Sequence, residues 1–300
     1  MPAKPTLSRA LGGLVAVNLS TAALGASVPD TVAAVPQQVW AVSDLVRCKD
    51  GYFNDPGARD VVATIDAPIA LPGDLVAPSG TTEQFATCFD PLWGGLKARM
   101  HPTPGNHEYN TYRAEPYYAY FDVAPYYAWW AGSWQMFSVN SMCGHHGGCG
   151  VGSPMYRWLE TRLQAQTGVC QAVYWHHPRW SQGMGGNIEK MAPLYELIDR
   201  YDVELLLVGN ENGVYERYAA LDGLGRPNPR GVTESVVSTG GVTDGAGRVT
   251  ANVPSPVVRH DGTRGALLLT LAASTWSAEY VAEAGSNLTD SASGTCFRPA

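Results

Sequence analysis

Short apolar runs that end in polar turns constrain the fold of this 300-residue chain more than any other feature. Each run has the length of a buried strand and finishes in Asp, His or Asn. The runs cover residues 38–44, 68–74, 170–178 and 203–210. Because such strand ends gather functional groups in α/β sheets, we expect their polar side chains to meet at one edge.

Helical patterns lie between these strands at residues 81–99, 154–166 and 188–201, with a Thr-Glu capping order in the first and a proline opening the second. Residues 234–241, 264–274 and 275–284 then follow as strands without intervening helices. This order predicts an α/β fold, a layered sandwich with mixed sheets that ends in a β-meander or a second sheet. The tail after Ala284 is small and polar, and we expect Cys296 alone to hold it.

The N-terminus has the order of a secretory signal: Lys4 and Arg9, then an apolar stretch at 11–26 that is rich in small residues. It is too short to anchor as a spanning helix. We therefore expect residues 1–30 to be removed, with cleavage between Gly25 and Ala34, and the mature protein to be secreted. The alternative is a helix that belongs to the fold.

The charge balance excludes two kinds of partner. A net charge of -7 and a pI near 5.5 provide no basic surface for a nucleic acid or an anionic membrane. A small substrate or a neutral polymer remains a possible partner. No pattern in the sequence indicates an oligomeric state.

Six cysteines in an exported chain indicate disulfides. We expect Cys143 to pair with Cys149 across a glycine-rich loop, and more loosely Cys48 with Cys88 and Cys170 with Cys296. A zinc cluster is the alternative, but the chain has no C-x-x-C pair to support it.

Residues 104–109, PGNHEY, carry the strongest local signal for chemistry. Asn106 offers an amide oxygen to a metal, and His107 offers a proton donor to a leaving oxygen. Asp44, Asp74 and His176 each stand at the end of an expected strand. Carboxylates, an amide and an imidazole at strand ends are the groups that a two-metal hydrolytic site needs.

An aromatic-rich stretch, residues 109–134, follows this signal directly. It forms either a wall beside the active cleft or a flap that packs on the core.

In this order, Asp44, Asp74, GNHE at 105–108, the histidine of WHHPRW and GNENGVYER at 209–217 resemble the calcineurin-like metallophosphoesterases, most of all the secreted bacterial branch related to purple acid phosphatases. The resemblance covers residues 38–298 as a single domain. It implies a four-layer αββα sandwich of two mixed sheets flanked by helices, with a metal centre that activates water against phosphate esters.

The resemblance also implies residue roles. Asp44 would bind a first metal, Asp74 would bridge, and Asn106 and His176 would bind the second. His107 would contact the phosphate and help protonate the leaving oxygen. Asn106 and, more weakly, His177 would also bind the substrate.

Three ligand positions depart from the family pattern. Ala77 stands where the purple branch has tyrosine, and Asn210 and Asn212 replace two histidines. Asn210 is either a weak amide ligand or a turn cap, and Asn212 with Gly213 suits a tight turn.

With these losses we expect one divalent metal rather than two. The oxygen-rich set suits Mn, Mg or Ca better than Zn or Fe. The sequence predicts a secreted phosphoesterase relative, weakly active on a phosphate-ester small molecule or phosphorylated polymer. The alternative is an inactive member that binds a phosphate, a glycan or a protein.

Overall fold

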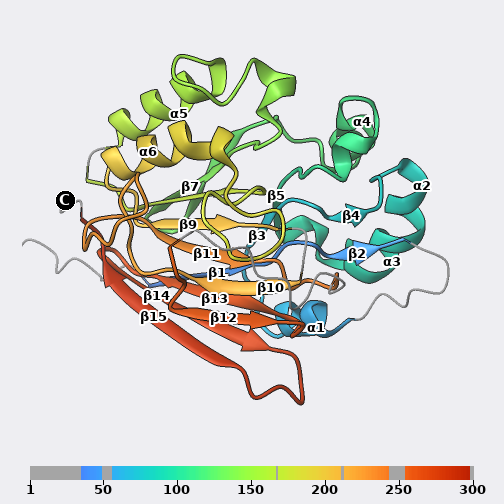
Figure 1. Cartoon of the computed structure of the whole chain (residues 1–300). Helices are drawn as coiled ribbons and strands as arrows, with labels where there is room; N and C mark the ends of the chain where they lie inside the picture. The colour runs from blue at the N-terminus through green and yellow to red at the C-terminus, as the bar shows by residue number, and fades with distance from the viewer. Residues whose placement is uncertain (1–34, 49–55, 167, 211–212, 243–253, 298–300) are drawn as a thin grey trace, which may run out of the picture. The chain divides into compact units, whose positions relative to one another are not determined.

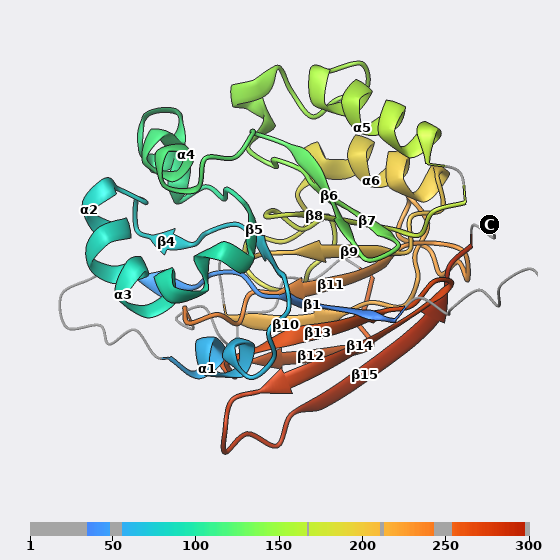
Figure 2. The same cartoon turned by 180° about the vertical axis from the view of Figure 1, so that it is seen from behind.

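Two mixed β-sheets lie face to face with helices on their outer faces (Figures 1 and 2). The computed structural model describes residues 35–48, 56–166, 168–210, 213–242 and 254–297. The expected signal segment and Asn212 lie outside these ranges. The arrangement is the four-layer mixed α/β sandwich that the sequence predicts.

The six-stranded sheet has the order β15-β14-β13-β1-β3-β5. Strands β1, β3 and β5 run parallel, and the last three strands of the chain add to β1 as an antiparallel meander. The strands are β1 (Gln37–Ala41), β3 (Ile69–Pro72), β5 (Met100–Thr103), β13 (Gly265–Leu271), β14 (Thr275–Ala282) and β15 (Thr289–Thr295).

The polar tail corrects one expectation. Residues 289–295 pair with β14 along their whole length, so Cys296 is not the only tether. Their alternation of small polar residues hid the strand, because it lacks the branched and aromatic side chains that mark strands in a sequence.

The seven-stranded sheet has the order β12-β10-β11-β9-β8-β7-β6. Its four inner strands β11, β9, β8 and β7 are parallel, and the flanking strands are antiparallel. The strands are β6 (Tyr127–Ala131), β7 (Trp134–Ser138), β8 (Gln171–Trp175), β9 (Leu205–Val208), β10 (Val214–Arg217), β11 (Thr233–Val237) and β12 (Val258–Asp261). A separate pair joins β2 (Val46–Arg47) to β4 (Val76–Ala77).

All three expected helical segments are confirmed. The first is a continuous run made of α2 (Thr82–Gln84), a π-helical turn (Phe85–Phe89), α3 (Asp90–Trp93) and a 3-10 turn (Gly94–Arg99). It starts with a capping box between Thr81 and Gln84. The second is α5 (Pro154–Ala165), and the third is a 3-10 turn (Glu189–Met191) with α6 (Ala192–Arg200).

The remaining helices are shorter. Helix α1 (Gly57–Ala63) packs against the six-stranded sheet, and α4 (Glu115–Phe121) and β6 lie within the aromatic stretch. Single 3-10 turns lie at Glu108–Asn110, Tyr112–Ala114 and Cys143–His146. No helix in the described ranges is both long and apolar enough to cross a bilayer.

Strand β1 shows how the layers divide the core. Val39 and Ala41 pack between the two sheets, whereas Trp40 and Val42 pack toward the helices on the outer side. This follows from the two-residue period of a strand. Helices α5 and α6 bury their apolar faces on the seven-stranded sheet, in a third cluster.

The three expected disulfides are all present: Cys48–Cys88, Cys143–Cys149 and Cys170–Cys296. Among the described residues, the one trio of possible metal-ligating carboxylate, imidazole or thiol atoms within 4.8 Å of one another comes from Cys170, Glu204 and Cys296. Both of those cysteines are in a disulfide, so the zinc-cluster alternative has no thiolates to use.

Candidate metal centre

The polar residues singled out in the sequence follow the carboxyl ends of strands. Asp44 follows β1, Asp74 follows β3, His176 follows β8 and Asn210 follows β9. Asn106 and His107 lie in the turn after β5. Parallel strands in both sheets thus deliver these groups to one end of the sandwich.

Asp74 is where three of these segments meet. Its Oδ2 atom lies 3.1 Å from His176 Nε2 and 3.7 Å from His107 Nε2. The backbone N–H of His107 donates to Asp74 Oδ1 at 3.0 Å. The turns after β3, β5 and β8 are therefore joined through one buried carboxylate.

The backbone is shaped to present the two aspartates. Asp44 and Asp74 both have left-handed conformations, with φ of 59° and 51°. Such conformations cost free energy for residues with a Cβ and persist where the surrounding structure imposes them, often at functional sites. Gly105 allows the close approach, because a Cβ there would lie 2.0 Å from Asp74 Oδ1.

The imidazole of His176 is held in a defined tautomer. Its Nδ1–H donates to the Pro72 carbonyl at 3.0 Å, and a carbonyl can only accept. Nε2 is therefore the ring atom left for another partner, which is the arrangement of metal-ligating histidines.

Three buried polar atoms of this centre have no hydrogen bond to the rest of the described chain: Asn106 Oδ1, and the facing pair Asp74 Oδ2 and His176 Nε2, which lie 3.1 Å apart. Unsatisfied buried atoms are costly and need an explanation. A divalent cation would satisfy all three with a carboxylate oxygen, an amide oxygen and an imidazole nitrogen. The donor set therefore fits a metal.

The charges around these atoms agree with that fit. Burial lowers the pKa of His176, but the Asp74 carboxylate outweighs it and raises the pKa to about 10. Burial raises the pKa of Asp74, but His176 and His107 outweigh it and lower the pKa to about 2. A proton on His176 Nε2 therefore occupies the position beside Asp74 at which a cation would bind.

Asp44 is bound differently. The Ser43 hydroxyl donates to Asp44 Oδ2 at 2.6 Å. Burial raises the pKa of Asp44 to about 7, while His176 and hydrogen bonds from Ser43 and Ser238 act in the opposite direction. The carboxylate that a first metal would need therefore already accepts hydrogen bonds from protein hydroxyls.

The structure places two of the positions at which the sequence departs from the expected ligand pattern, Asn210 and Ala77. Asn210 is buried, and its amide donates to Ser181 Oγ at 2.8 Å. Its backbone carbonyl accepts a hydrogen bond from Ser238. Ala77 is buried in β4, where its methyl group brings no donor atom.

His107 is the titratable group beside Asp74 that stays accessible, with a quarter (25%) of its side chain exposed. Its Nδ1–H donates to the Pro78 carbonyl at 2.8 Å, so Nε2 is free to face Asp74. Burial lowers the pKa of His107, but Asp74 and the Pro78 carbonyl outweigh it and the pKa is raised. His107 can therefore hold a proton at Nε2.

His177, the neighbour of His176, lies against Ser141, with 2.8 Å between Nδ1 and the hydroxyl oxygen. Burial, with a smaller contribution from His176, lowers the pKa of His177 to about 3. Its ring is therefore neutral, and it can contact a phosphate only through hydrogen bonds.

Glu108 is a residue that our sequence reasoning missed. Its buried carboxylate accepts four backbone hydrogen bonds, at 2.8–3.1 Å, from Gly105, Asp74, Leu75 and Val76. Burial raises the pKa of Glu108 to about 7, and the hydrogen bonds oppose that rise. Its place directly after Asn106 and His107 was the available signal.

Two further glutamates hold the loop that follows His176. Glu234 accepts a hydrogen bond from the backbone N–H of Trp180 at 3.3 Å, and Glu216 accepts one from Gln182 at 3.1 Å. Both glutamates are buried. Each is a glutamate inside a buried strand, β10 or β11, and that was the sequence signal.

The fold and this centre define a class of protein. A sequence model of the calcineurin-like phosphoesterase family matches residues 38–211. The chain therefore belongs to the calcineurin-like phosphoesterase family. No curated protein matches its sequence significantly.

Solved structures agree on the fold. A purple acid phosphatase, PPD1, from yellow lupin (Lupinus luteus) seeds superposes with a TM-score of 0.73 at 17% identity over 88% of this chain and 55% of its own. GAP50, the anchor in the inner membrane complex of Plasmodium, gives 0.65 at 11% identity over 88% and 90%. PhoD gives 0.60 at 13% identity over 89% and 71%. This chain thus spans little more than half of the lupin phosphatase.

Proposed function

We propose that this phosphoesterase relative hydrolyses phosphate esters with a single divalent cation. One observation carries the proposal. Asn106 Oδ1 is buried without a hydrogen-bond partner in the described structure, and Asp74 Oδ2 and His176 Nε2 are hydrogen-bonded to nothing but each other, whereas hydroxyls already bind the carboxylate of Asp44. The chain thus offers donors for one ion, with Asn210 as a further weak ligand.

The donor types favour a hard cation. One carboxylate, one amide and one imidazole suit Mn, Mg or Ca better than Zn or Fe. When bound, the cation would lower the pKa of water and stabilise negative charge on the phosphate.

Residues of the chain would supply the proton, bind the phosphate and hold the turns of the centre in place. His107 holds a proton at Nε2 beside the centre, because its Nδ1–H is committed to Pro78, and it would deliver that proton to the leaving oxygen. Asn106, His107 and, through hydrogen bonds, His177 would bind the phosphate. Glu108 keeps the two turns around Asp74 in place.

The substrate class we propose is a phosphate ester, either a small molecule or a phosphorylated polymer. We further propose that the mature protein is secreted. Three disulfides support this location, because such bonds persist in oxidising compartments.

The test compares two isosteric variants, each with an aspartate changed at a strand end. Purified mature protein is loaded with manganese, its metal content is measured, and p-nitrophenyl phosphate turnover is followed. We expect about one ion per chain in the wild type and in Asp44→Asn. Asp74→Asn should lose the metal and at least about 100-fold in kcat/KM.

Two results would contradict the proposal. Two ions per chain, one of them lost in Asp44→Asn, would establish a dinuclear centre. Neither metal nor turnover with any divalent cation would favour the second candidate, a secreted binding module. The lost ligands Ala77 and Asn210 favour that candidate, as does likeness in fold to a protein described as an anchor.

A further inference from the structure

The aromatic stretch and the short disulfide loop meet beside the metal centre. Tyr109 lies two residues after His107, and Asn140, which follows β7, donates a side-chain hydrogen bond to the Tyr109 hydroxyl at 2.8 Å. The next residue, Ser141, has its hydroxyl oxygen 2.8 Å from Nδ1 of His177. The segment that leads into the disulfide loop is therefore tied to two of the turns that carry proposed metal ligands, those after β5 and β8.

Two histidines of the disulfide loop pack on Tyr109. The ring of His145 stacks on the tyrosine ring, with centroids 4.4 Å apart and an angle of 22° between the planes. His146 Nε2 lies 2.7 Å from the tyrosine hydroxyl oxygen. The disulfide Cys143–Cys149 closes the loop that holds both imidazoles. Both rings are thus fixed in position, although His145 is exposed and His146 is half-buried.

The hydrogen bonds of Tyr109 determine which nitrogen of His146 carries a hydrogen. The tyrosine hydroxyl has one proton, and its two possible acceptors are His146 Nε2 at 2.7 Å and the Tyr118 hydroxyl at 3.1 Å. Burial raises the pKa of Tyr109, and hydrogen bonds from Tyr118 and Asn140 oppose that rise, which makes Tyr118 a donor to Tyr109. Tyr109 therefore gives its own proton to His146 Nε2.

His146 consequently offers an N–H group to a ligand. Burial, together with His145 and Arg113, lowers the pKa of His146, so its ring is neutral near pH 7. With Nε2 as an acceptor, the ring hydrogen lies on Nδ1. Nδ1 makes no hydrogen bond to the residues that the structure describes, and it is not among the buried atoms.

Arg113 adds a positive charge at the same edge. It lies in the turn Tyr112–Ala114, and its charge favours the deprotonated forms of both Tyr109 and His146. Arg113 and Ala114 have left-handed backbone conformations, with φ of 51° and 53°. Such conformations persist where the surrounding structure imposes them, often at functional sites.

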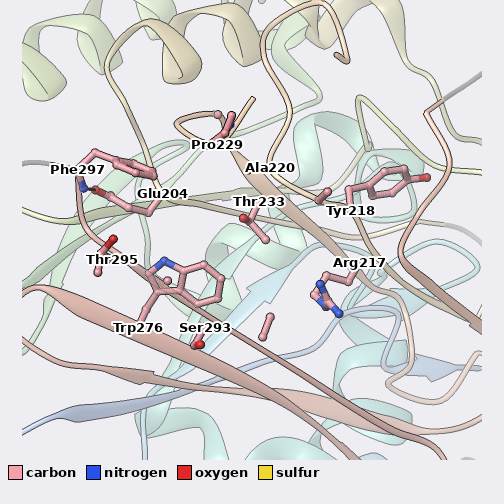
Figure 3. A pocket seen from close by; sticks show the side chains of 14 residues that line it. Glu204, Arg217, Tyr218, Ala220, Pro229, Thr233, Trp276, Ser293, Thr295 and Phe297 are labelled. Atoms are coloured by element: carbon pink, nitrogen blue, oxygen red, sulfur yellow. Dashed lines mark hydrogen bonds between the residues drawn. The ribbon is translucent and has the colours of Figure 1, made fainter. Parts of the chain in front are cut away.

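The guanidinium of Arg113 is not committed to a carboxylate. The side chain is exposed and makes neither an ion pair nor a hydrogen bond within the described ranges. Arg217 provides the contrast: Figure 3 shows it at the side of a cavity of about 360 Å³, but its guanidinium is paired with Asp290, at 2.7 and 2.8 Å. Arg113 therefore keeps its N–H donors for an anion.

A guanidinium and an imidazole N–H thus share one edge of the centre, and both can only donate there. Phosphate oxygens are the acceptors that such a set of donors binds best. We propose that Arg113 and His146, with His145 beside them, bind a second phosphate group of the substrate. This inference rests on the proposed hydrolysis, and it narrows the substrate class to esters with more than one phosphate group.

Binding to the metal-free protein tests the subsite itself. Inorganic phosphate is titrated into the full mature protein while the ring resonances of His145 and His146 are followed by NMR. We expect saturable shifts of both rings with a Kd on the order of 10 mM, and binding at least about fivefold weaker in Arg113→Gln. Arg157→Gln is the matched control, because Arg157 on α5 is also exposed and makes no ion pair in the described structure.

Turnover tests the link to the substrate. The manganese-loaded protein is given alkanediol bisphosphates and alkyl monophosphates of matched chain length, and kcat/KM is compared. We expect a preference of about tenfold for the bisphosphate at the best spacer length, which Arg113→Gln loses and Arg157→Gln keeps. A short best spacer would indicate a small bisphosphate as the substrate, and a preference that keeps rising with length would indicate a phosphorylated polymer.

The proposal is overturned if phosphate shifts neither ring, or if Arg113→Gln and Arg157→Gln respond equally. It is also overturned if bisphosphates and monophosphates are hydrolysed equally well. If no ester is hydrolysed, the proposed hydrolysis fails, and calorimetry with the same pairs of compounds decides the second-phosphate site separately. Tighter binding of the bisphosphate then supports the site, and equal binding overturns it.

Discussion

Glu108 organises the candidate centre although it offers no ligand to a metal. Its two oxygens accept hydrogen bonds from backbone N–H groups in the turn after β3 and in the turn after β5. These two turns are far apart in the sequence. Those turns carry Asp74 and Asn106, so the distance between two proposed ligands depends on a third side chain. Outer partners of this kind orient metal ligands.

Replacing Glu108 with glutamine should therefore be costly. The amide keeps one acceptor but turns an NH₂ group toward backbone N–H donors, leaving them unsatisfied. We expect the free energy of unfolding to fall by about 2–4 kcal/mol, measured by urea denaturation, with weaker manganese binding.

The control for this change is Glu83→Gln, at an exposed position in the first turn of α2. It should change stability by less than about 0.5 kcal/mol. Equal stabilities of the two variants would mean that the four hydrogen bonds to Glu108 contribute nothing net.

Strand β15 shows how an element with weak propensity is held. It contains no large apolar side chain, yet it pairs along β14 and is joined to the start of β8 through Cys170–Cys296. That disulfide closes 126 residues, whereas Cys143–Cys149 closes 6. Crosslinks over longer loops remove more entropy from the unfolded chain.

The two disulfides should thus differ in what their removal costs. By loop entropy, changing Cys170 and Cys296 together to alanine should cost about 5 kcal/mol, and changing Cys143 and Cys149 together about 2 kcal/mol. Thermal and urea unfolding of the two double variants measure this. A larger loss from the short loop would show that local packing, and not chain entropy, governs these crosslinks.

Patterns in the sequence predicted the elements whose burial is one-sided or complete. β1, β3, β8 and β9 were readable because they are apolar runs, and α5 and α6 because their apolar residues recur at helical spacing. β15 was missed because pairing and a crosslink hold it, and neither is visible in local composition.

Some hydrogen bonds of the centre join segments that are distant in the sequence, so no single segment predicts them. Residues after each strand end could be named as ligands, but the hydrogen bond from Ser238 to Asp44 and the Glu108 clamp depend on segments far apart in the chain. The positions of the strand ends predict which residues come together in the fold. They do not predict which of those residues already accepts a hydrogen bond from another side chain.

One ion pair joins the two sheets and should be visible in the pH dependence of stability. Arg217 on β10 pairs with Asp290 on β15, with side chains 13% and 5% exposed, and Tyr215 also donates to Asp290. Burial raises the pKa of Asp290, but the hydrogen bonds from Arg217 and Tyr215 outweigh it and lower the pKa below 3.8. Because the folded pKa is depressed, the stabilisation is complete above the unfolded value and is lost as the pH falls through the folded one.

Asp290→Asn should accordingly destabilise the protein by about 2–4 kcal/mol near neutral pH, since it leaves Arg217 partly buried without its counter-charge. Urea denaturation over a pH series should show this difference shrinking as the pH falls from about 3.8 towards the depressed folded pKa, below which the wild-type carboxylate is itself protonated. Asp202→Asn is the control, because its partner Arg230 is exposed and such surface pairs contribute less than about 1 kcal/mol. A difference for Asp290→Asn that stays constant down to the acid transition would mean that its charge does not hold the two sheets together.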